Sequence, residues 1–246
     1  MGFLPPLDVL VRLPLAPWML LQGLRIKRKA LILPEAAGPR EGCSGKGSDL
    51  RVLIVGDSSG AGVGVADQKD ALSGQLVAAL EKTHRVGWKL VAKTGATTKS
   101  ATVLLGSEPG TAYDVAVLAL GVNDVAQLLF VSRWRARQTQ LRNHLRARFK
   151  VRKIFVIAVP PLQHFPVLPS LLQWILGAHA ARMNDALQED IVNDADTHLV
   201  TIDLPFTPDA LASDGFHPSA RTYALWGQIM ADEITRTDIA RHKIRS

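Results

Sequence analysis

The sequence is poor in cysteine, in charge and in long apolar runs. A single cysteine, Cys43, excludes an internal disulfide and cannot supply the cysteine pairs of structural zinc sites. Charged residues make up 21% of the chain and hydrophobic residues 47%, which excludes a wholly disordered protein. Nothing in this composition requires an oxidising compartment, so a cytoplasmic location is expected. At about 150 residues per domain, 246 residues fit one domain or one domain with an appendage.

The first 29 residues are apolar but contain no stretch long enough to span a membrane. The longest uncharged stretch there, residues 13–24, is well short of the ~18 residues that a spanning helix needs. A secretory signal carries its basic residues before the apolar stretch, whereas here they follow it, as Arg25, Lys27, Arg28 and Lys29. We therefore predict an arm over residues 1–35 and a glycine-rich linker over 36–48. The arm either contacts an anionic membrane surface or packs against the domain or its substrate opening.

Residues 49–246 alternate between short apolar runs and helical patterns, which predicts one α/β domain. Continuous β-branched runs separated by helices are typical of a parallel sheet that is covered on both faces. We expect a doubly wound three-layer α/β/α sandwich, in which five parallel strands are formed by Arg51–Val55, Trp88–Ala92, Asp114–Leu120, Lys153–Val159 and His198–Ile202.

Polar residues follow four of these strands at the point where each strand ends. The four segments are Gly56–Gly60, Thr94–Ala96, Gly121–Asp124 and Asp214–Pro218. The carboxyl ends of parallel strands share one edge of the sheet, where open α/β folds place their sites. The sequence therefore predicts that these four segments converge.

Together these segments contain the groups that acyl transfer needs. Ser58 lies on a glycine-flanked turn and would be the nucleophile, with His217 as its base. Asp214 precedes His217 by three residues and would orient the imidazole. The backbone N–H groups of Ser58 and Gly95 and the side-chain amide of Asn123 would form the oxyanion hole. This set needs neither metal nor cofactor.

The same residues resemble the motifs of the SGNH/GDSL hydrolase superfamily over residues 50–235. The four motif residues match Ser58 in GDSS, Gly95 in KTGATT, Asn123 in GVND and His217 in DGFHP. The resemblance implies a flavodoxin-like fold and an esterase, lipase or thioesterase that passes through an acyl-serine intermediate. Two positions depart from the family pattern. Ser59 replaces the usual aliphatic residue, and Thr94 stands where asparagine often precedes the glycine.

Some of these residues also fit other patterns. The G-x-S-x-G pattern also fits the nucleophile elbow of α/β-hydrolases, but that fold would place several strands before the serine. The nearby glycines match neither phosphate-loop pattern. Asp57 and Asp124 are interpreted as turn-capping residues. His164, in the proline-rich loop after the fourth strand, is the rival base, and the hydroxyl of Ser59 is the rival nucleophile.

The net charge of +7 is concentrated in residues 132–153, which hold nine Lys or Arg residues and no acid. Apolar residues recur there at helical spacing, which predicts an amphipathic helix whose outer face is cationic: Trp134, Leu141, Leu145 and Phe149. No nucleic-acid recognition motif accompanies the charge, so no nucleic-acid partner is expected.

These observations predict a serine carboxylester hydrolase that acts on small-molecule esters with short to medium acyl chains. Apolar residues after the Asn123 turn and after the fourth strand are candidates for the acyl site: Val125, Leu128, Leu129, Phe165 and Leu168. A thioesterase, acyltransferase or lysophospholipase could use the same triad. A non-catalytic protein that binds a membrane or nucleic acid through its basic residues is the remaining alternative.

Overall fold

A mostly parallel β-sheet forms the centre of the protein. The computed structural model describes residues 6–29, 31–203 and 207–245, and these form a six-stranded sheet of order β1-β3-β2-β4-β5-β6. The five predicted strands are all present and parallel: β2 (Ser48–Gly56), β3 (His84–Ala92), β4 (Val115–Ala119), β5 (Lys153–Ile157) and β6 (Thr197–Val200). β3 pairs with one side of β2, and the chain then crosses to β4, which pairs with the other side of β2. The carboxyl ends of β2 and β4 therefore flank the point where the strand order reverses, which is where such sheets bind ligands.

The expected count of five strands is wrong because the predicted linker contributes a sixth. β1 (Glu41–Ser44) pairs antiparallel with β3, so that Gly42 lies opposite Trp88 and Cys43 opposite Gly87. This edge strand is mostly exposed and carries no run of apolar or β-branched side chains. Its pairing depends on backbone hydrogen bonds and on the surface ion pair of Glu41 with Lys89 of β3. Neither leaves a hydrophobic pattern in the sequence.

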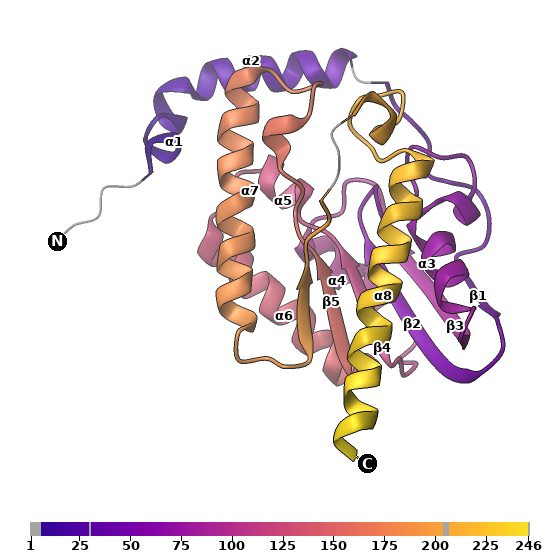
Figure 1. The fold of residues 1–246 in the computed structure, drawn as a ribbon. Coiled ribbons are helices and arrows are strands. Elements are labelled where there is room, and N and C mark those ends of the chain that lie inside the picture. The colour runs from indigo at the N-terminus through magenta and orange to yellow at the C-terminus, as the bar shows by residue number, and fades with distance from the viewer. Residues whose placement is uncertain (1–5, 30, 204–206, 246) are drawn as a thin grey trace.

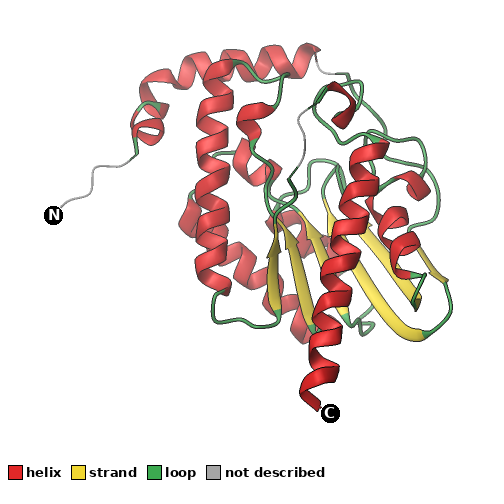
Figure 2. Cartoon of the chain, viewed as in Figure 1, coloured by secondary structure: helices red, strands yellow, loops and turns green. Residues whose placement is uncertain are grey.

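Helices cover both faces of the sheet, as the three-layer prediction requires (Figures 1 and 2). α3 (Leu72–Leu80) and α8 (Ala220–Arg245) pack on one face, and α4 (Thr98–Gly106), α6 (Val131–Phe149) and α7 (Ser170–Ile191) pack on the other. Alternate side chains of β2 serve the two layers, since Leu53 and Val55 contact the second set of helices while Val52 and Ile54 contact the first.

The basic segment forms the amphipathic helix that was predicted. The apolar residues named for it, Trp134, Leu141, Leu145 and Phe149, are all buried in α6 against the sheet. Most of its arginines remain on the outer side, where several pair with acidic residues, as Arg135 does with Glu189. The helix therefore buries one side along its length and keeps most of its charge in solvent or in ion pairs, with the buried Arg142 as an exception.

The N-terminal arm is helical and lies on the body of the protein. α1 (Leu7–Leu10) and α2 (Arg12–Lys29) both contact α7, and Met19 and Ile26 of α2 pack against the core. Figure 1 shows α2 crossing the end of the molecule toward which the sheet strands point. In the described part of the chain, no helix combines the length and the apolar character that crossing a bilayer requires.

Candidate active site

The turn after β2 brings the Ser58 hydroxyl to the carboxyl edge of the sheet. The backbone folds back so closely that a Cβ atom on Gly56 would lie 2.6 Å from the Cα of Gly60, and the reverse contact would be 2.7 Å. Only glycine fits at both positions. The turn is held by the N–H of Asp57 donating to the carbonyl of Ala119 on β4 (3.0 Å) and by the N–H of Ala61 donating to the carbonyl of Asp57 (2.8 Å).

Ser58, His217 and Asp214 form one hydrogen-bonded chain. Nε2 of His217 lies 2.9 Å from Oγ of Ser58, and its Nδ1 lies 2.5 Å from Oδ2 of Asp214. Ser58 and His217 are 159 positions apart in the sequence. The geometry suits a base that takes the serine proton while its far nitrogen is held by a carboxylate.

The Asp214 carboxylate is stabilised in its charged form. Its Oδ1 accepts the backbone N–H groups of Phe216 (2.9 Å) and His217 (3.0 Å). Burial alone would raise the pKa of Asp214, but hydrogen bonds from the ring and backbone of His217 and from Phe216 outweigh it, so that its pKa lies below the usual value. An ionised Asp214 favours the tautomer of His217 that leaves Nε2 free to accept a proton.

Asn123, at the start of α5 (Val122–Ala126), is oriented toward the same turn by Asp57. Its Nδ2 donates to Oδ2 of Asp57 (3.3 Å) and to the carbonyl of Ala96 (3.1 Å). Oδ1 of Asp57 accepts both the N–H (2.9 Å) and the hydroxyl (2.8 Å) of Ser59. The Ser59 hydroxyl is therefore bound to Asp57, while the Ser58 hydroxyl is bound to His217.

The carboxylate of Asp57 is fully buried in this network. Burial raises the pKa of Asp57, while the two hydrogen bonds from Ser59 act in the opposite direction. Asp57 makes its contacts with Ser59 and Asn123 on either side of the Ser58 turn. The carboxylate thus fixes that turn relative to α5.

The loop that carries Gly95 adjoins Asn123. Gly95 precedes Ala96, whose carbonyl accepts from the Asn123 amide. The φ of Gly95 is +79°, in the left-handed region, and no atom lies within 4 Å of the position that a Cβ would take there. The conformation of this loop, and not lack of space, is therefore what favours glycine.

Glu35, the last residue of the arm, and Arg40, in the predicted linker, hold this loop, and no sequence pattern indicates either residue. Oε1 of Glu35 accepts the N–H (2.7 Å) and the hydroxyl (2.8 Å) of Thr94. Arg40 donates to Oε2 of Glu35 (2.5 Å) and to the carbonyl of Ala92 at the end of β3 (2.8 Å). Thr94, which departs from the family pattern, is thus bound from outside the predicted domain. No local motif marks Glu35 or Arg40, because the residues that they hold, Thr94 and Ala92, lie more than fifty positions away.

A small apolar cavity of about 50 Å³ lies beside Ser58 and His217. Phe165, buried after β5, packs against Phe216 with 5.3 Å between ring centroids, and Phe216 lies edge-on to the His217 ring at 5.2 Å. The other apolar side chains that line this cavity include Leu120, Val122, Val159 and Leu211.

The predicted acyl-site residues fall in three different places. Phe165 lines the cavity beside Ser58. Leu128 and Leu168 line a separate groove beneath α2, whose volume is about 500 Å³. Val125 is fully buried in the core, and Leu129 packs against that core and accepts a hydrogen bond from His179.

The rival base, His164, lies in a short 3₁₀ helix (Leu162–His164) and is exposed. It lines a different hollow, together with Asn184 of α7. A further contact that sequence reasoning missed comes from Tyr223 of α8, which is buried and donates to the carbonyl of Val63 (2.7 Å). The N–H of Val63 in turn donates to the carbonyl of Ser58 (3.0 Å), so that α8 supports the turn that carries Ser58.

The fold is similar to those of several solved structures. The chain is 18% identical to a carbohydrate esterase family 2 enzyme of Corynascus thermopiles (TM-score 0.63, 83% of this chain and 68% of the other). It is 18% identical to the esterase EstA of Pseudoalteromonas sp. (TM-score 0.58, 76% and 98%). It is 16% identical to Est24, a carbohydrate acetylesterase from Sinorhizobium meliloti (TM-score 0.55, 76% and 99%). At these identities the likeness shows the fold alone.

A search of curated proteins gave no significant match. The model of the GDSL-like Lipase/Acylhydrolase family, in contrast, matches residues 54–225. The matched segment begins within β2 and ends within α8, so it includes Ser58, Asn123 and His217. The chain therefore belongs to the GDSL-like lipase/acylhydrolase family, whose members hydrolyse esters.

Proposed function

We propose that this protein hydrolyses carboxylic esters through an acyl-serine intermediate on Ser58. The observation that carries the proposal is the position of His217, within hydrogen-bond distance of both Ser58 and Asp214. A serine hydroxyl is a weak nucleophile until a base takes its proton, and this contact supplies the base.

In the first half of the reaction, Oγ of Ser58 attacks the ester carbonyl and its proton passes to Nε2 of His217. The negative charge on the carbonyl oxygen is stabilised by the N–H groups of Ser58 and Gly95 and by the amide of Asn123. The amide keeps its bond to Asp57 and transfers to the oxyanion the hydrogen that otherwise binds the Ala96 carbonyl. His217 then returns the proton to the departing alcohol, and the C–O bond of the ester breaks. In the second half, His217 deprotonates a water molecule that attacks the acyl-serine and releases the acid.

The size of the cavity beside Ser58 supports a short acyl group in the substrate. Pockets for drug-sized ligands hold about 300–1,000 Å³, whereas this cavity holds about 50 Å³ and is closed on one side by Phe165 and Phe216. A short acyl group such as acetyl fits that space better than a medium chain. The carbohydrate esterase and the carbohydrate acetylesterase among the similar structures also favour a short acyl group.

The test is a series of nitrophenyl esters, from acetyl to octanoyl, offered to the wild type and to three variants. We expect Ser58→Ala and His217→Ala to lose activity by at least a thousandfold, since removal of either leaves the other without its partner. Ser59→Ala should keep most of the activity, because that hydroxyl is bound to Asp57. The ratio kcat/KM should be highest for acetyl and should fall with chain length.

Full activity in Ser58→Ala would contradict this mechanism, and loss of activity in Ser59→Ala alone would transfer the role to the neighbouring hydroxyl. Matched thioesters, measured in the same series, test the alternative chemistry. If acetyl thioesters were cleaved well and oxygen esters not at all, the assignment as a carboxylesterase would be wrong.

A further inference from the structure

The side of α2 that faces away from the protein is apolar and exposed. Leu13 is 85% exposed and Trp18 is 50% exposed. The exposed residues that lie outside the groove beneath α2 recur at intervals of three or four and so share one side of the helix; this α2 outer face consists of Leu13, Pro14, Pro17, Trp18 and Leu21. Monomeric soluble proteins rarely expose so continuous an apolar surface unless it contacts a partner or a membrane.

The arm is anchored in an orientation that keeps this face outward. Asp8 is 4% exposed and accepts from Arg182 of α7 through both carboxylate oxygens (2.8 and 2.5 Å) and from Arg12 (2.9 Å). On the inner side of α2, Met19 and Ile26 pack on the core. The helix cannot turn its leucines inward without breaking the Asp8 ion pairs and exposing these two side chains.

The charge around the α2 outer face is of one sign. Residues 9–34 contain five basic residues and no acidic residue. Arg25 and Arg28, at the end of α2, are exposed next to the apolar side chains. An exposed tryptophan among leucines, followed by basic residues, matches the interfacial region of a bilayer that contains anionic lipid.

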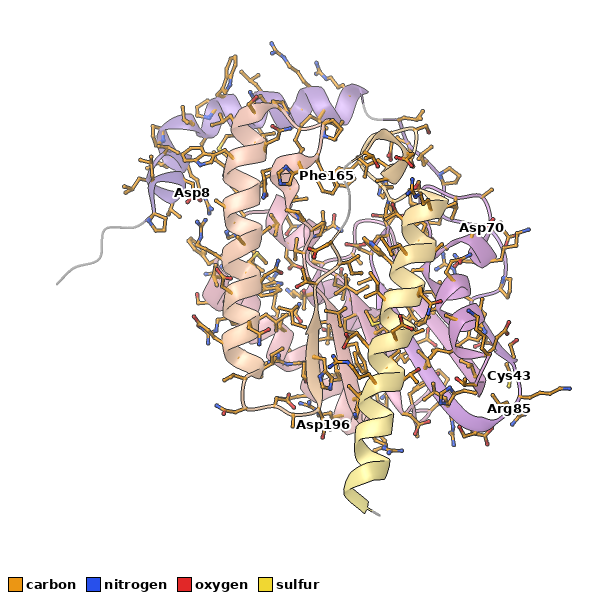
Figure 3. The ribbon with its side chains drawn as sticks, in the orientation of Figure 1. Asp8, Cys43, Asp70, Arg85, Phe165 and Asp196 are labelled. Atoms are coloured by element: carbon orange, nitrogen blue, oxygen red, sulfur yellow. The ribbon has the colours of Figure 1, made fainter. Side chains whose placement is uncertain are left out.

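The face also lies at the end of the molecule that contains the candidate active site. α2 crosses the end toward which the strands point, and Phe165, which lines the cavity beside Ser58, lies beneath it (Figures 1 and 3). A planar surface that contacts α2 would therefore approach the carboxyl edge of the sheet and not the opposite end.

We propose that the α2 outer face docks on the surface of a membrane that contains anionic lipid. The apolar side chains enter the interfacial region, while Arg25 and Arg28 contact the headgroups. This docking surface is independent of the chemistry at Ser58, so the Ser58→Ala variant also binds the membrane.

The experiment is co-sedimentation of the full-length chain with vesicles of phosphatidylcholine, alone or mixed with phosphatidylglycerol. We expect the wild type and Ser58→Ala to bind the mixed vesicles equally and to bind less as salt is raised. The triple variant Leu13→Ser/Trp18→Ser/Leu21→Ser should lower the partition coefficient at least tenfold. Arg25→Ser/Arg28→Ser should lower it by on the order of tenfold on mixed vesicles only.

The controls replace exposed apolar and basic residues elsewhere on the surface by serine. Val103→Ser/Val192→Ser removes two exposed valines, and Lys46→Ser/Lys82→Ser removes two exposed lysines beyond the amino end of β2. Both should bind like the wild type. Nitrophenyl acetate hydrolysis and the thermal midpoint show that each variant is folded, and they separate loss of docking from loss of the esterase chemistry.

The proposal is overturned if the wild type does not bind mixed vesicles, or if the triple variant binds them as well as the wild type does. Sedimentation velocity tests the remaining possibility, that a second copy of the chain covers the α2 outer face. A wild-type dimer that fails to bind vesicles, and that becomes a monomer in the triple variant, would show that a second copy of the chain covers this face.

Discussion

At the residue scale, Asp57 is the group on which the arrangement around Ser58 depends most. It is buried, it lies next to Ser58, the proposed nucleophile, and it accepts hydrogen bonds from Ser59 on one side and Asn123 on the other. The sequence motif indicated a turn-capping role, and the contacts with Ser59 agree with that interpretation. The link to Asn123 could not be predicted, because it joins residues 66 positions apart.

Replacing Asp57 by asparagine should separate this positioning role from stability. The amide has one oxygen where the carboxylate has two, so an NH₂ group must face either Ser59 or the Nδ2 of Asn123, and two donors then oppose each other. We expect kcat to fall about 10- to 100-fold with KM little changed, since the Asn123 amide would no longer be oriented toward the oxyanion.

The thermal midpoint of Asp57→Asn should change little, because the variant also removes a buried charge whose burial is unfavourable. Ser59→Ala, which removes one of the hydrogen bonds to Asp57, is the matched control and should reduce kcat less. An Asp57→Asn enzyme with unchanged kcat would show that Asp57 does not position Asn123.

At the element scale, the elements with a hydrophobic pattern were predictable, whereas those held by polar contacts were not. The β2, β4 and β5 strands and α6 carry periodic or continuous apolar residues, and they appear where the pattern predicts them. β1 carries no such pattern and was missed. The position of the arm depends on Asp8 meeting Arg182, 174 positions away, which no local signal could indicate.

The same distinction applies to the candidate site. Ser58, Asn123, Asp214 and His217 were identified because each lies in a short motif at the end of a strand or just before a helix. The acyl-site residues were chosen only as apolar residues near those motifs, and the structure distributes them between the cavity, the α2 groove and the core. Local apolar composition does not distinguish a pocket wall from core packing.

Glu35, at the end of the arm, should support catalysis through the Gly95 loop. Glu35→Ala removes the acceptor for the N–H and hydroxyl of Thr94 and leaves Arg40 unpaired. We expect kcat to fall about tenfold with little change in KM. This loss is smaller than the roughly 10²- to 10³-fold fall in kcat that follows full loss of an oxyanion donor. Steady-state kinetics on nitrophenyl acetate measure both constants.

Glu35→Gln is the conservative counterpart, because its oxygen can still accept from Thr94, and it should recover most of the rate. Glu41→Ala is the control, since Glu41 lies close by in β1 but pairs with Lys89 on the surface. If Glu35→Ala kept the full kcat, or if Glu35→Gln were equally impaired, the loop would not depend on this hydrogen bond.

At the scale of the whole molecule, the interface between the arm and α7 contains a buried histidine that should make stability depend on pH. Burial, together with the cations of Arg12 and Arg182, lowers the pKa of His179 to about 4, although its Nε2 donates to the carbonyl of Leu129 (2.9 Å). In the unfolded chain its pKa returns to about 6.5. Between these values the unfolded chain binds a proton that the folded protein does not, so stability falls as pH decreases from about 6.5 to 4.

From pH 7 to pH 5, this difference in His179 should lower the free energy of unfolding by about 2 kcal/mol. Urea denaturation at both pH values measures the change. His179→Gln keeps a donor for Leu129 and has no titrating group, so it should show a loss smaller by about that amount. An equal loss in the variant would place the acid-sensitive group elsewhere.

The carboxylate of Asp8, in the same interface, titrates over a lower pH range than His179. Burial would raise the pKa of Asp8, but the hydrogen bonds and charges of Arg182 and Arg12 outweigh it, and the pKa lies below its usual value. Its contribution is present above the usual aspartate pKa and is lost only as pH falls through the lowered value. The arm should therefore stay attached at pH 5, where His179 already reduces stability.

The most direct test of the central claim is to trap the acyl-enzyme. The wild type is mixed with excess nitrophenyl acetate, quenched in acid within the first turnover, digested and measured by peptide mass spectrometry. The mechanism predicts one acetyl group on the peptide that contains residues 56–60, with fragment ions that place it on Ser58, and no acetylation in His217→Ala. Acetyl on Ser59, or steady hydrolysis without any acetylated serine, would contradict it.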